Sequence, residues 1–356
     1  MSEALAHHYL AGDGVQLHAV CAEPELANGK PPVILCHGMP GLWFSWRHQL
    51  PALAAAGYFA IAIDQRGYGR SDRPSDVNAY TSTHTVQDLC CVLDYFDAPR
   101  GYFVGQDFGA AQVYNLALRQ PDKVAGLVGM ACPYDFDFSG RSGSGLPGRG
   151  GQDDARAFAR SDKKPSECFA AIAEHQFFYA HYYQTIGPAE QEFANAPEKF
   201  LRRLFWALSA KGRLLEWSDY PKEVQGYIDV LAEPERKPPW HWMSEDDIQF
   251  YVDEFMNAAS GKEFIGGLNA YRAADANWQL TKATAASIIE PPSLFIAGAE
   301  DPVIKMIDPS AFDVLQQASA DLRGIHLIAD AGHFVQAEQA EQCNKHLIEF
   351  LDTLTE

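Results

Sequence analysis

A carboxylate in a turn between a strand and a helix is the residue of this sequence best placed to do chemistry. Asp107 lies in Gly105-Gln-Asp-Phe-Gly109, after the apolar run 102–104 and before residues 110–119, which we expect to be helical. This pattern, with small residues two positions before and after the reactive residue, is typical of a nucleophile elbow, in which a strained turn exposes the reactive side chain. An Asp carboxylate is already an anion at neutral pH, so it needs no base to become a nucleophile. Taken alone, the motif is better explained by an ordinary loop Asp that caps the following helix.

Two more residues with catalytic side chains follow apolar runs near the C-terminus. Asp301 comes after the run 293–297, and His333 comes after the run 324–329. Both runs have the length of buried strands, and the loops at the carboxyl ends of parallel strands converge on one ligand crevice. We therefore expect Asp107, Asp301 and His333 to meet at one edge of a sheet, in the chain order nucleophile, acid, base. Three roles on three strand ends favour a catalytic triad over an isolated loop Asp.

A second acid competes with Asp301 for the role of orienting His333. Asp135 stands just after the predicted strand that ends at Cys132. Its carboxylate is therefore expected at the same edge of the sheet as the other two catalytic side chains. We prefer Asp301 and keep Asp135 as the alternative.

The elements that must position these residues alternate between strand and helix. A leading hairpin turns at residues 12–14. Apolar runs expected to form buried strands cover 32–36, 59–63, 102–104 and 124–132, and the expected helices cover 46–56, 85–96 and 110–119. This alternation predicts an α/β fold, with a mostly parallel sheet and helices on both of its faces.

The alternation breaks after Pro133. Residues 139–151 are rich in Gly, Ser and Arg, and residues 166–272 have the pattern of several amphipathic helices with no strand among them. We interpret this stretch as a helical lid inserted into the sheet. The predicted division is a first part of the core at 1–135, the lid insertion at 136–274 with its Gly-rich loop at 139–151, and a second part of the core at 275–356.

Composition excludes several function classes. The chain has 356 residues, of which 47% are hydrophobic, and a net charge of −19 with no cluster of basic residues. This argues against nucleic acid and anionic membranes as partners. No apolar run reaches the roughly 18 residues of a membrane span, and the N-terminus lacks the pattern of a secretory signal. We expect a cytoplasmic protein whose seven scattered Cys are reduced. A homo-oligomer is compatible with the sequence, which carries no signature of one.

Other motifs that suggest cofactors are explained more simply. Residues 143–148 match the glycine spacing of a dinucleotide fingerprint, but no apolar strand precedes them and Pro147 lies inside. His175 and His181 have no third ligand at metal-binding spacing. We therefore predict neither a cofactor nor a metal.

Taken together, the chain resembles the soluble epoxide hydrolases of the α/β-hydrolase superfamily. The matching motifs are His37-Gly-Met-Pro40, Asp64-x-Arg-Gly-Tyr-Gly-x-Ser71, the Asp107 elbow, Asp301 and Gly332-His333. The similarity covers nearly everything apart from residues 1–12 and the Gly-rich loop. It implies an α/β-hydrolase fold with a helical lid, and a hydrolase that adds water to a small-molecule epoxide to give a vicinal diol.

The resemblance gives each residue of the triad a role. Asp107 would form an alkyl ester with the substrate, and His333 would activate the water that hydrolyses this ester. Asp301 would hold the imidazole in the right tautomer. The backbone N–H groups of Met39 and Phe108 would form the oxyanion hole, in which one donor is worth on the order of 3 kcal/mol.

The resemblance also implies two proton donors in the lid. Residues 177–179 and 268–272 are similar to the segments that carry the family's lid tyrosines, which here are Tyr179 and Tyr271. A Tyr is neutral at pH 7 and can protonate the oxygen of an opening epoxide. We expect Phe108, Pro40 and Trp240 to bind the substrate, although packing within the lid is the simpler explanation for Trp240.

Two alternatives share parts of this pattern. Haloalkane dehalogenases have the same triad, but they place Trp after the nucleophile and often Asn in the first loop, where this chain has Phe108 and Met39. Fluoroacetate dehalogenases carry arginines near the elbow, where this chain has Ala110, Ala111 and Tyr114. A non-catalytic relative that binds a small ligand would have no use for the triad, the oxyanion loop and both tyrosines.

Two positions depart from the commonest pattern of the family. Gln106 stands where a His usually precedes the nucleophile, and Phe108 stands where Trp usually follows it. We expect Phe108 to change the wall of the substrate pocket and Gln106 to matter little.

Overall fold

A computed structural model gives the architecture of most of the chain. It describes residues 5–26, 29–134, 162–214, 219–238, 240–284, 286–307 and 309–355. The predicted Gly-rich loop at 139–151 and the alternative acid Asp135 lie outside the described residues.

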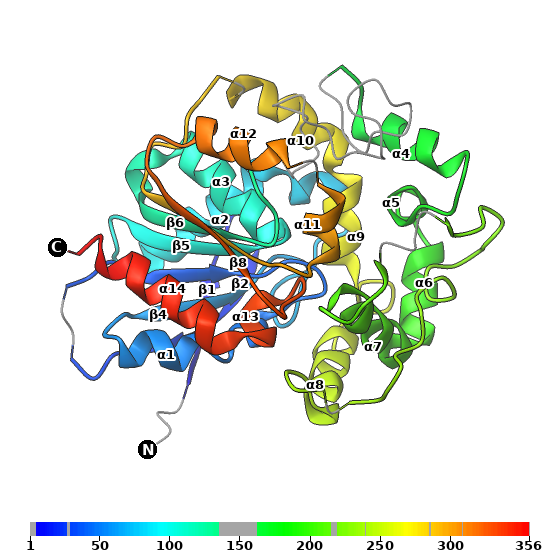
Figure 1. The fold of residues 1–356 in the computed structure, drawn as a ribbon, viewed down its shortest axis with the longest axis horizontal. Coiled ribbons are helices and arrows are strands. Elements are labelled where there is room, and N and C mark those ends of the chain that lie inside the picture. The colour runs from blue at the N-terminus through cyan, green and yellow to red at the C-terminus, as the bar shows by residue number, and fades with distance from the viewer. Residues whose placement is uncertain are drawn as a thin grey trace.

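An eight-stranded sheet forms the centre of the molecule (Figure 1). The strands are β1 (Ala6–Ala11), β2 (Gln16–Ala22), β3 (Val33–Cys36), β4 (Ala60–Asp64), β5 (Gly101–Gln106), β6 (Val124–Met130), β7 (Ser293–Gly298) and β8 (Leu322–Ile328). Their order across the sheet is β1-β2-β4-β3-β5-β6-β7-β8. The hairpin β1–β2 and the pair β2–β4 are antiparallel, and the remaining pairs are parallel. This is the predicted fold class.

Alternate residues of the strands point to two separate apolar cores. In β3, Ile34 and Cys36 belong to one core, and Val33 and Leu35 belong to the other. The first core is covered by α2 (Ser82–Tyr95), α3 (Phe108–Arg119) and α12 (Ser310–Ala318), and the second by α1 (Gln49–Ala55) and α14 (Ala340–Asp352). Every residue of β3 is buried, as expected for a strand covered on both faces. Each large side chain buried in this way contributes roughly 1.5–3 kcal/mol to stability.

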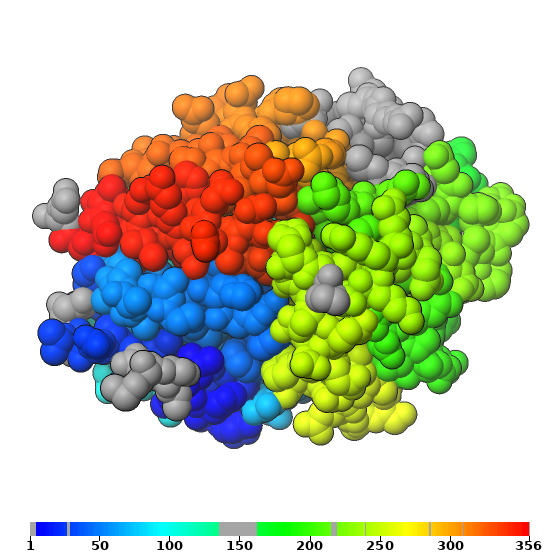
Figure 2. Space-filling view, turned by 60° about the horizontal axis from the view of Figure 1, so that its bottom comes forward, coloured from blue at the N-terminus to red at the C-terminus, as the bar shows by residue number. Residues whose placement is uncertain are grey.

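The helices between β6 and β7 form the predicted lid at one end of the sheet (Figure 1). They are α4 (Pro165–Ala173), α5 (Tyr179–Tyr182), α6 (Pro188–Asn195), α7 (Pro197–Leu208), α8 (Glu245–Met256) and α9 (Ile265–Arg272). In Figure 2 the lid, coloured green to yellow, lies directly against the N-terminal and C-terminal parts of the core. After α9, α10 (Ala274–Thr281) and the short helix Lys282–Thr284 lead back to the sheet. Among the described helices, none is long and apolar enough to cross a bilayer.

The C-terminal helix differs from its prediction. The sequence pattern predicts one helix over residues 338–354, whereas the structure has a short helix α13 (Val335–Glu338) followed by α14. The two are separated at Gln339, whose φ of −134° and ψ of 56° are not helical. The carboxylate of Glu338, the last residue of α13, accepts hydrogen bonds from the backbone of Ala210 and Phe334.

Candidate active site

The backbone holds Asp107 in a strained conformation between β5 and α3. Its φ is 56° and its ψ is −121°, a region that costs a non-glycine residue about 1–3 kcal/mol. The turn also requires a very close approach of chain segments. A Cβ on Gly105 would lie 2.1 Å from the carbonyl oxygen of Gly109, and one on Gly109 would lie 2.1 Å from the carbonyl oxygen of Cys36. The small residues of the motif are therefore required by space around the strained carboxylate.

The loop after β3 supplies a hydrogen-bond donor to this carboxylate. The Met39 N–H donates to Asp107 Oδ1 at 2.8 Å. The loop is held by His37, a buried ring whose Nε2 accepts from the Gln65 N–H at 3.1 Å. Burial lowers the pKa of His37, so the neutral ring acts as part of the scaffold. Phe108 begins α3, and its N–H belongs to the first turn, whose donors find their acceptors outside the helix.

His333 lies between the two predicted acidic residues. Its Nδ1 is 3.1 Å from Asp301 Oδ2, and its Nε2 is 3.6 Å from Asp107 Oδ2. Asp301 has no exposed surface and also accepts a hydrogen bond from the Val303 N–H at 2.8 Å. Burial by itself lowers the pKa of His333, but Asp301 and Asp107 outweigh it and raise that pKa to about 10. While Asp107 is ionised, His333 is therefore a cation held between two carboxylates.

Three further contacts reach the triad from residues that the sequence analysis did not assign to it. The Gln106 side-chain amide donates to the His333 backbone carbonyl at 3.1 Å, so the position that we expected to matter little contacts His333 directly. The Cys132 thiol lies 3.9 Å from Asp107 Oδ2. The His333 N–H donates to the Leu208 carbonyl in the lid at 2.9 Å. Gln106 and Cys132 stand next to predicted motifs in the sequence, and this proximity could have indicated their contacts. Nothing in the sequence indicated the contact with Leu208.

The lid brings Tyr179 and Tyr271 together over Phe108. Their rings are nearly perpendicular at 5.6 Å, and the Tyr271 ring stands edge-on to Phe108 at 5.0 Å. Burial is the largest cause that raises the pKa of both phenols, and the negative charge of Asp107 raises them further. Both phenols are therefore neutral at pH 7 and able to donate a proton.

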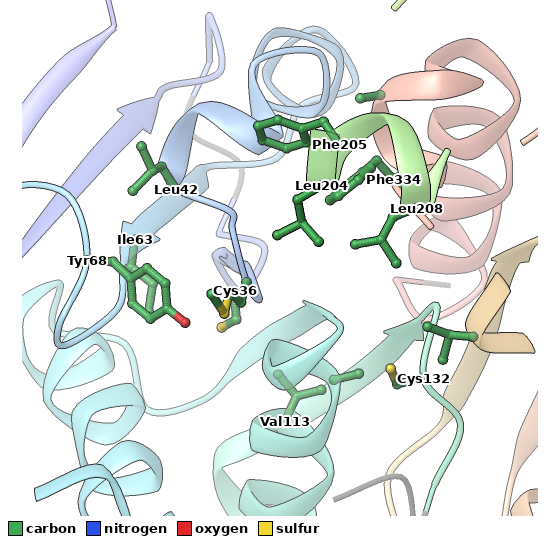
Figure 3. Close-up of a cluster of buried hydrophobic side chains, with 14 of the residues drawn as sticks. Cys36, Leu42, Ile63, Tyr68, Val113, Cys132, Leu204, Phe205, Leu208 and Phe334 are labelled. Atoms are coloured by element: carbon green, nitrogen blue, oxygen red, sulfur yellow. The ribbon is translucent and has the colours of Figure 1, made fainter. Parts of the chain in front are cut away.

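The other residues predicted to bind substrate lie in different surroundings. Pro40 is buried in the same loop as Met39. Trp240 is also buried, and its ring packs against Trp206 at 5.2 Å and Trp242 at 5.6 Å. These contacts belong to the interior of the lid, so binding of substrate by Trp240 stays a prediction. Figure 3 shows that Leu204, Leu208, Val113 and Cys132 carry apolar side chains on the facing sides of lid and core.

Comparisons with known proteins identify the family of this chain. A model of the α/β hydrolase fold family matches residues 31–340. The chain is 36% identical to epoxide hydrolase A of Mycobacterium tuberculosis, with 96% of each chain covered, and 31% identical to an epoxide hydrolase of Caballeronia sordidicola, with 97% of this chain and 93% of that protein covered. This chain belongs to the epoxide hydrolases of the α/β hydrolase family.

Solved structures of epoxide hydrolases have the same fold over the whole chain. The crystal structure of epoxide hydrolase A from Mycobacterium thermoresistibile has a TM-score of 0.81 and 36% identity, with 98% of each chain covered. The epoxide hydrolase from an endophytic Streptomyces has a TM-score of 0.83 and 30% identity, with 99% of this chain and 97% of that one covered. The predicted family and fold are confirmed, and the dehalogenase alternative is not favoured.

Proposed function

We propose that this epoxide hydrolase opens a small-molecule epoxide by forming an ester on Asp107 and hydrolyses that ester with water activated by His333. The observation that carries this assignment is the pair of neutral phenols, Tyr179 and Tyr271, above a carboxylate that one N–H group already holds in place. A halide leaving group is best received by N–H donors. An epoxide oxygen instead needs a proton, and a phenol supplies one.

In the first step, Asp107 Oδ2 attacks a ring carbon of the epoxide. Oδ1 is engaged by the Met39 N–H, so we assign the attack to Oδ2, which lies 3.6 Å from His333 Nε2. The carbon–oxygen bond of the ring breaks as the new ester bond forms. Tyr179 or Tyr271 gives its proton to the departing oxygen and becomes a phenolate, while the second tyrosine, whose ring lies 5.6 Å away, stays neutral.

Alkylation of Asp107 then converts His333 into a base. The carboxylate charge of Asp107 helps to raise the pKa of His333 to about 10, and the ester removes this charge. The His333 proton becomes more acidic and can return to the phenolate. The neutral imidazole, oriented by Asp301, takes a proton from a water that attacks the ester carbon. The resulting oxyanion develops on Oδ1, where the Met39 N–H donates at 2.8 Å. Collapse of this intermediate breaks the bond between the ester carbon and Oδ2, and the expelled alkoxide takes the proton of the new carboxylic acid. The diol leaves, and the Asp107 carboxylate and the His333 cation are restored, with one water oxygen now in the carboxylate.

The decisive experiment follows the ester on Asp107. We expect His333→Gln to form the ester and hydrolyse it very slowly, so that intact-protein mass spectrometry after addition of styrene oxide shows the mass of the enzyme plus one substrate. Asp107→Ala is the matched control and should show no adduct and no diol. Diol formation by Asp107→Ala would contradict the mechanism. Halide release from an alkyl halide, with no adduct from any epoxide, would contradict the substrate class.

A further inference from the structure

A buried carboxylate that takes no part in the proposed chemistry lies next to the general base. Glu338 ends the short helix α13 and is 3% exposed. Its Oε2 accepts from the Ala210 N–H at 2.8 Å, and its Oε1 accepts from the Phe334 N–H at 3.2 Å. The Gly332 N–H also stabilises its charged form. One side chain therefore binds the backbone just after His333 and the backbone of the lid just after α7.

The surrounding contacts join lid and core closely beside His333. The His333 N–H donates to the Leu208 carbonyl at 2.9 Å, which gives an orphan carbonyl at the end of α7 a partner in the core. A Cβ on Gly332 would lie 2.3 Å from the Ala210 nitrogen, so the two backbones touch. His241, from a second lid segment, lies with Nε2 3.0 Å from the Glu338 carbonyl oxygen.

Aromatic side chains fill the space around this junction. Phe334 lies 5.1 Å from the ring of Phe205 and stacks on Trp242 at 5.6 Å. Figure 3 shows Phe334 beside Phe205 and Leu208 of α7. Because this packing excludes water, the Glu338 carboxylate depends on backbone N–H groups rather than on solvent for its stabilisation.

The ionisation of Glu338 has opposing causes. Burial raises its pKa to about 7, the three backbone N–H groups oppose this rise, and the charge of Asp301 adds to it. The titratable groups on the elements around it are Asp301, His333 and His241. A carboxylate offers two acceptor oxygens, whereas a Gln offers one oxygen and an NH₂ group that would face N–H donors. The ionised form therefore suits the site in which Glu338 lies.

We propose that Glu338 is a positioning residue for the general base, which ties the backbone of Gly332–Phe334 to Ala210 of the lid and so fixes the His333 ring relative to Asp107. This role rests on the proposed function. It predicts that loss of Glu338 slows ester hydrolysis and leaves alkylation of Asp107 unaffected. Alkylation needs no proton transfer at His333, whereas ester hydrolysis needs the imidazole placed to within a fraction of an ångström of its water.

The test measures the two steps separately in Glu338→Gln. In single-turnover experiments with styrene oxide, we expect the alkylation rate and the dissociation constant of the substrate to change less than about twofold and ester hydrolysis to slow roughly tenfold, so that the ester accumulates. Protonation of Glu338 should mimic the variant, so the difference in hydrolysis rate between wild type and Glu338→Gln should narrow from about pH 8 to about pH 6.

Glu254→Gln is the matched control, because Glu254 is another buried carboxylate between lid and core. It pairs with Arg70 at 2.7 Å, away from His333, so its loss should leave the ratio of hydrolysis to alkylation unchanged. If Glu338→Gln does not fold, Glu338→Asp, which keeps both oxygens on a shorter stem, is measured in the same way and should also slow hydrolysis selectively.

Two outcomes would overturn the positioning role. One is equal slowing of both steps, and the other is hydrolysis at the wild-type rate in a folded Glu338 variant. Both are distinguishable from failure of the proposed function, in which the wild type itself would form no ester on Asp107.

Discussion

The two halves of the site are held in different ways. On the core side, Asp107, Met39 and His333 stand at the ends of sheet strands, and backbone atoms approach so closely that a single added methyl group would collide with a carbonyl oxygen. On the lid side, Tyr179 and Tyr271 are held by ring packing, with ring centroids 5.6 Å apart, and the Tyr271 centroid lies 5.0 Å from that of Phe108.

This difference follows the chemistry asked of each half. A nucleophile and an oxyanion donor act over one bond length, so they need a scaffold that cannot adjust. A proton donor must reach the epoxide oxygen of whichever substrate is bound, and side-chain packing allows the small adjustments that this requires. We therefore expect the core to determine which reaction is catalysed and the lid to determine which epoxides are accepted.

The largest effect is expected from a methyl group placed in the core half. Gly109→Ala would put Cβ 2.1 Å from the Cys36 carbonyl oxygen, in the middle of the sheet. We expect a loss on the order of 3 kcal/mol or more in the free energy of unfolding, and no measurable diol formation. Gly324→Ala on the edge strand β8 is the control, since its nearest contact is a His326 side-chain atom at 3.1 Å. Urea unfolding measures the stability of both variants. Equal stability would contradict the conclusion that the core half cannot adjust.

In the lid half, removing one tyrosine hydroxyl should lower the rate of ester formation and leave the free energy of unfolding nearly unchanged. Tyr271→Phe keeps the ring contacts with Phe108 and Tyr179 but removes a proton donor. We expect the rate of ester formation to fall about 10²-fold, and the double variant with Tyr179→Phe to lose more. Stopped-flow or quench-flow measurement of alkylation gives both values. An unchanged rate in the double variant would mean that the proton comes from elsewhere.

The pH dependence of the free energy of unfolding should reveal the charge of His333 in the core half. Because the pKa of His333 is raised from 6.5 to about 10, its contribution to stability is complete below about pH 6.5 and is lost as the pH rises toward 10. The free energy of unfolding should fall across this window with a slope of up to about 1.4 kcal/mol per pH unit. His333→Gln should flatten this slope in urea titrations, and an identical slope in the variant would contradict the assignment of the cation.

The smallest effect is expected deep in the lid. Trp240 is surrounded by Trp206 and Trp242, so Trp240→Phe should cost about 1–2 kcal/mol in stability. We expect KM for small and bulky epoxides to stay within about twofold, because the contacts of this ring lie inside the lid. A KM that changes with the size of the epoxide would instead make Trp240 part of the substrate pocket.

Much of the core half could be predicted from the sequence because local rules decide it. Apolar runs of strand length, each followed by Asp107, Asp301 or His333, were enough to bring three distant residues to one sheet edge. The structure places these side chains within 3.1 Å and 3.6 Å of one another. The two lid tyrosines came from family resemblance, since nothing local distinguishes them from the other tyrosines of the chain.

The contacts between the halves could not be predicted in this way. Glu338 and Leu208 act through backbone groups of residues far away in the chain, and such pairings leave no periodic or compositional trace. The pattern of residues 338–354 predicted a continuous helix, and only the structure reveals the break at Gln339. Lid–core contacts are decided by tertiary packing, which overrides helix propensity.

The backbone N–H of His333 donates to the backbone carbonyl of Leu208, so hydrogen exchange at this amide depends on separation of the lid from the core. This amide can exchange its hydrogen for deuterium only when α7 moves away from the loop that carries the base. At a pH high enough for chemical exchange to outpace reclosing, its exchange rate equals the rate of opening at this junction, whereas amides in the middle of β5 exchange on global unfolding. If substrate enters by this route, exchange at His333 in that limit will be at least as fast as turnover, and slower exchange would require a passage elsewhere between lid and core.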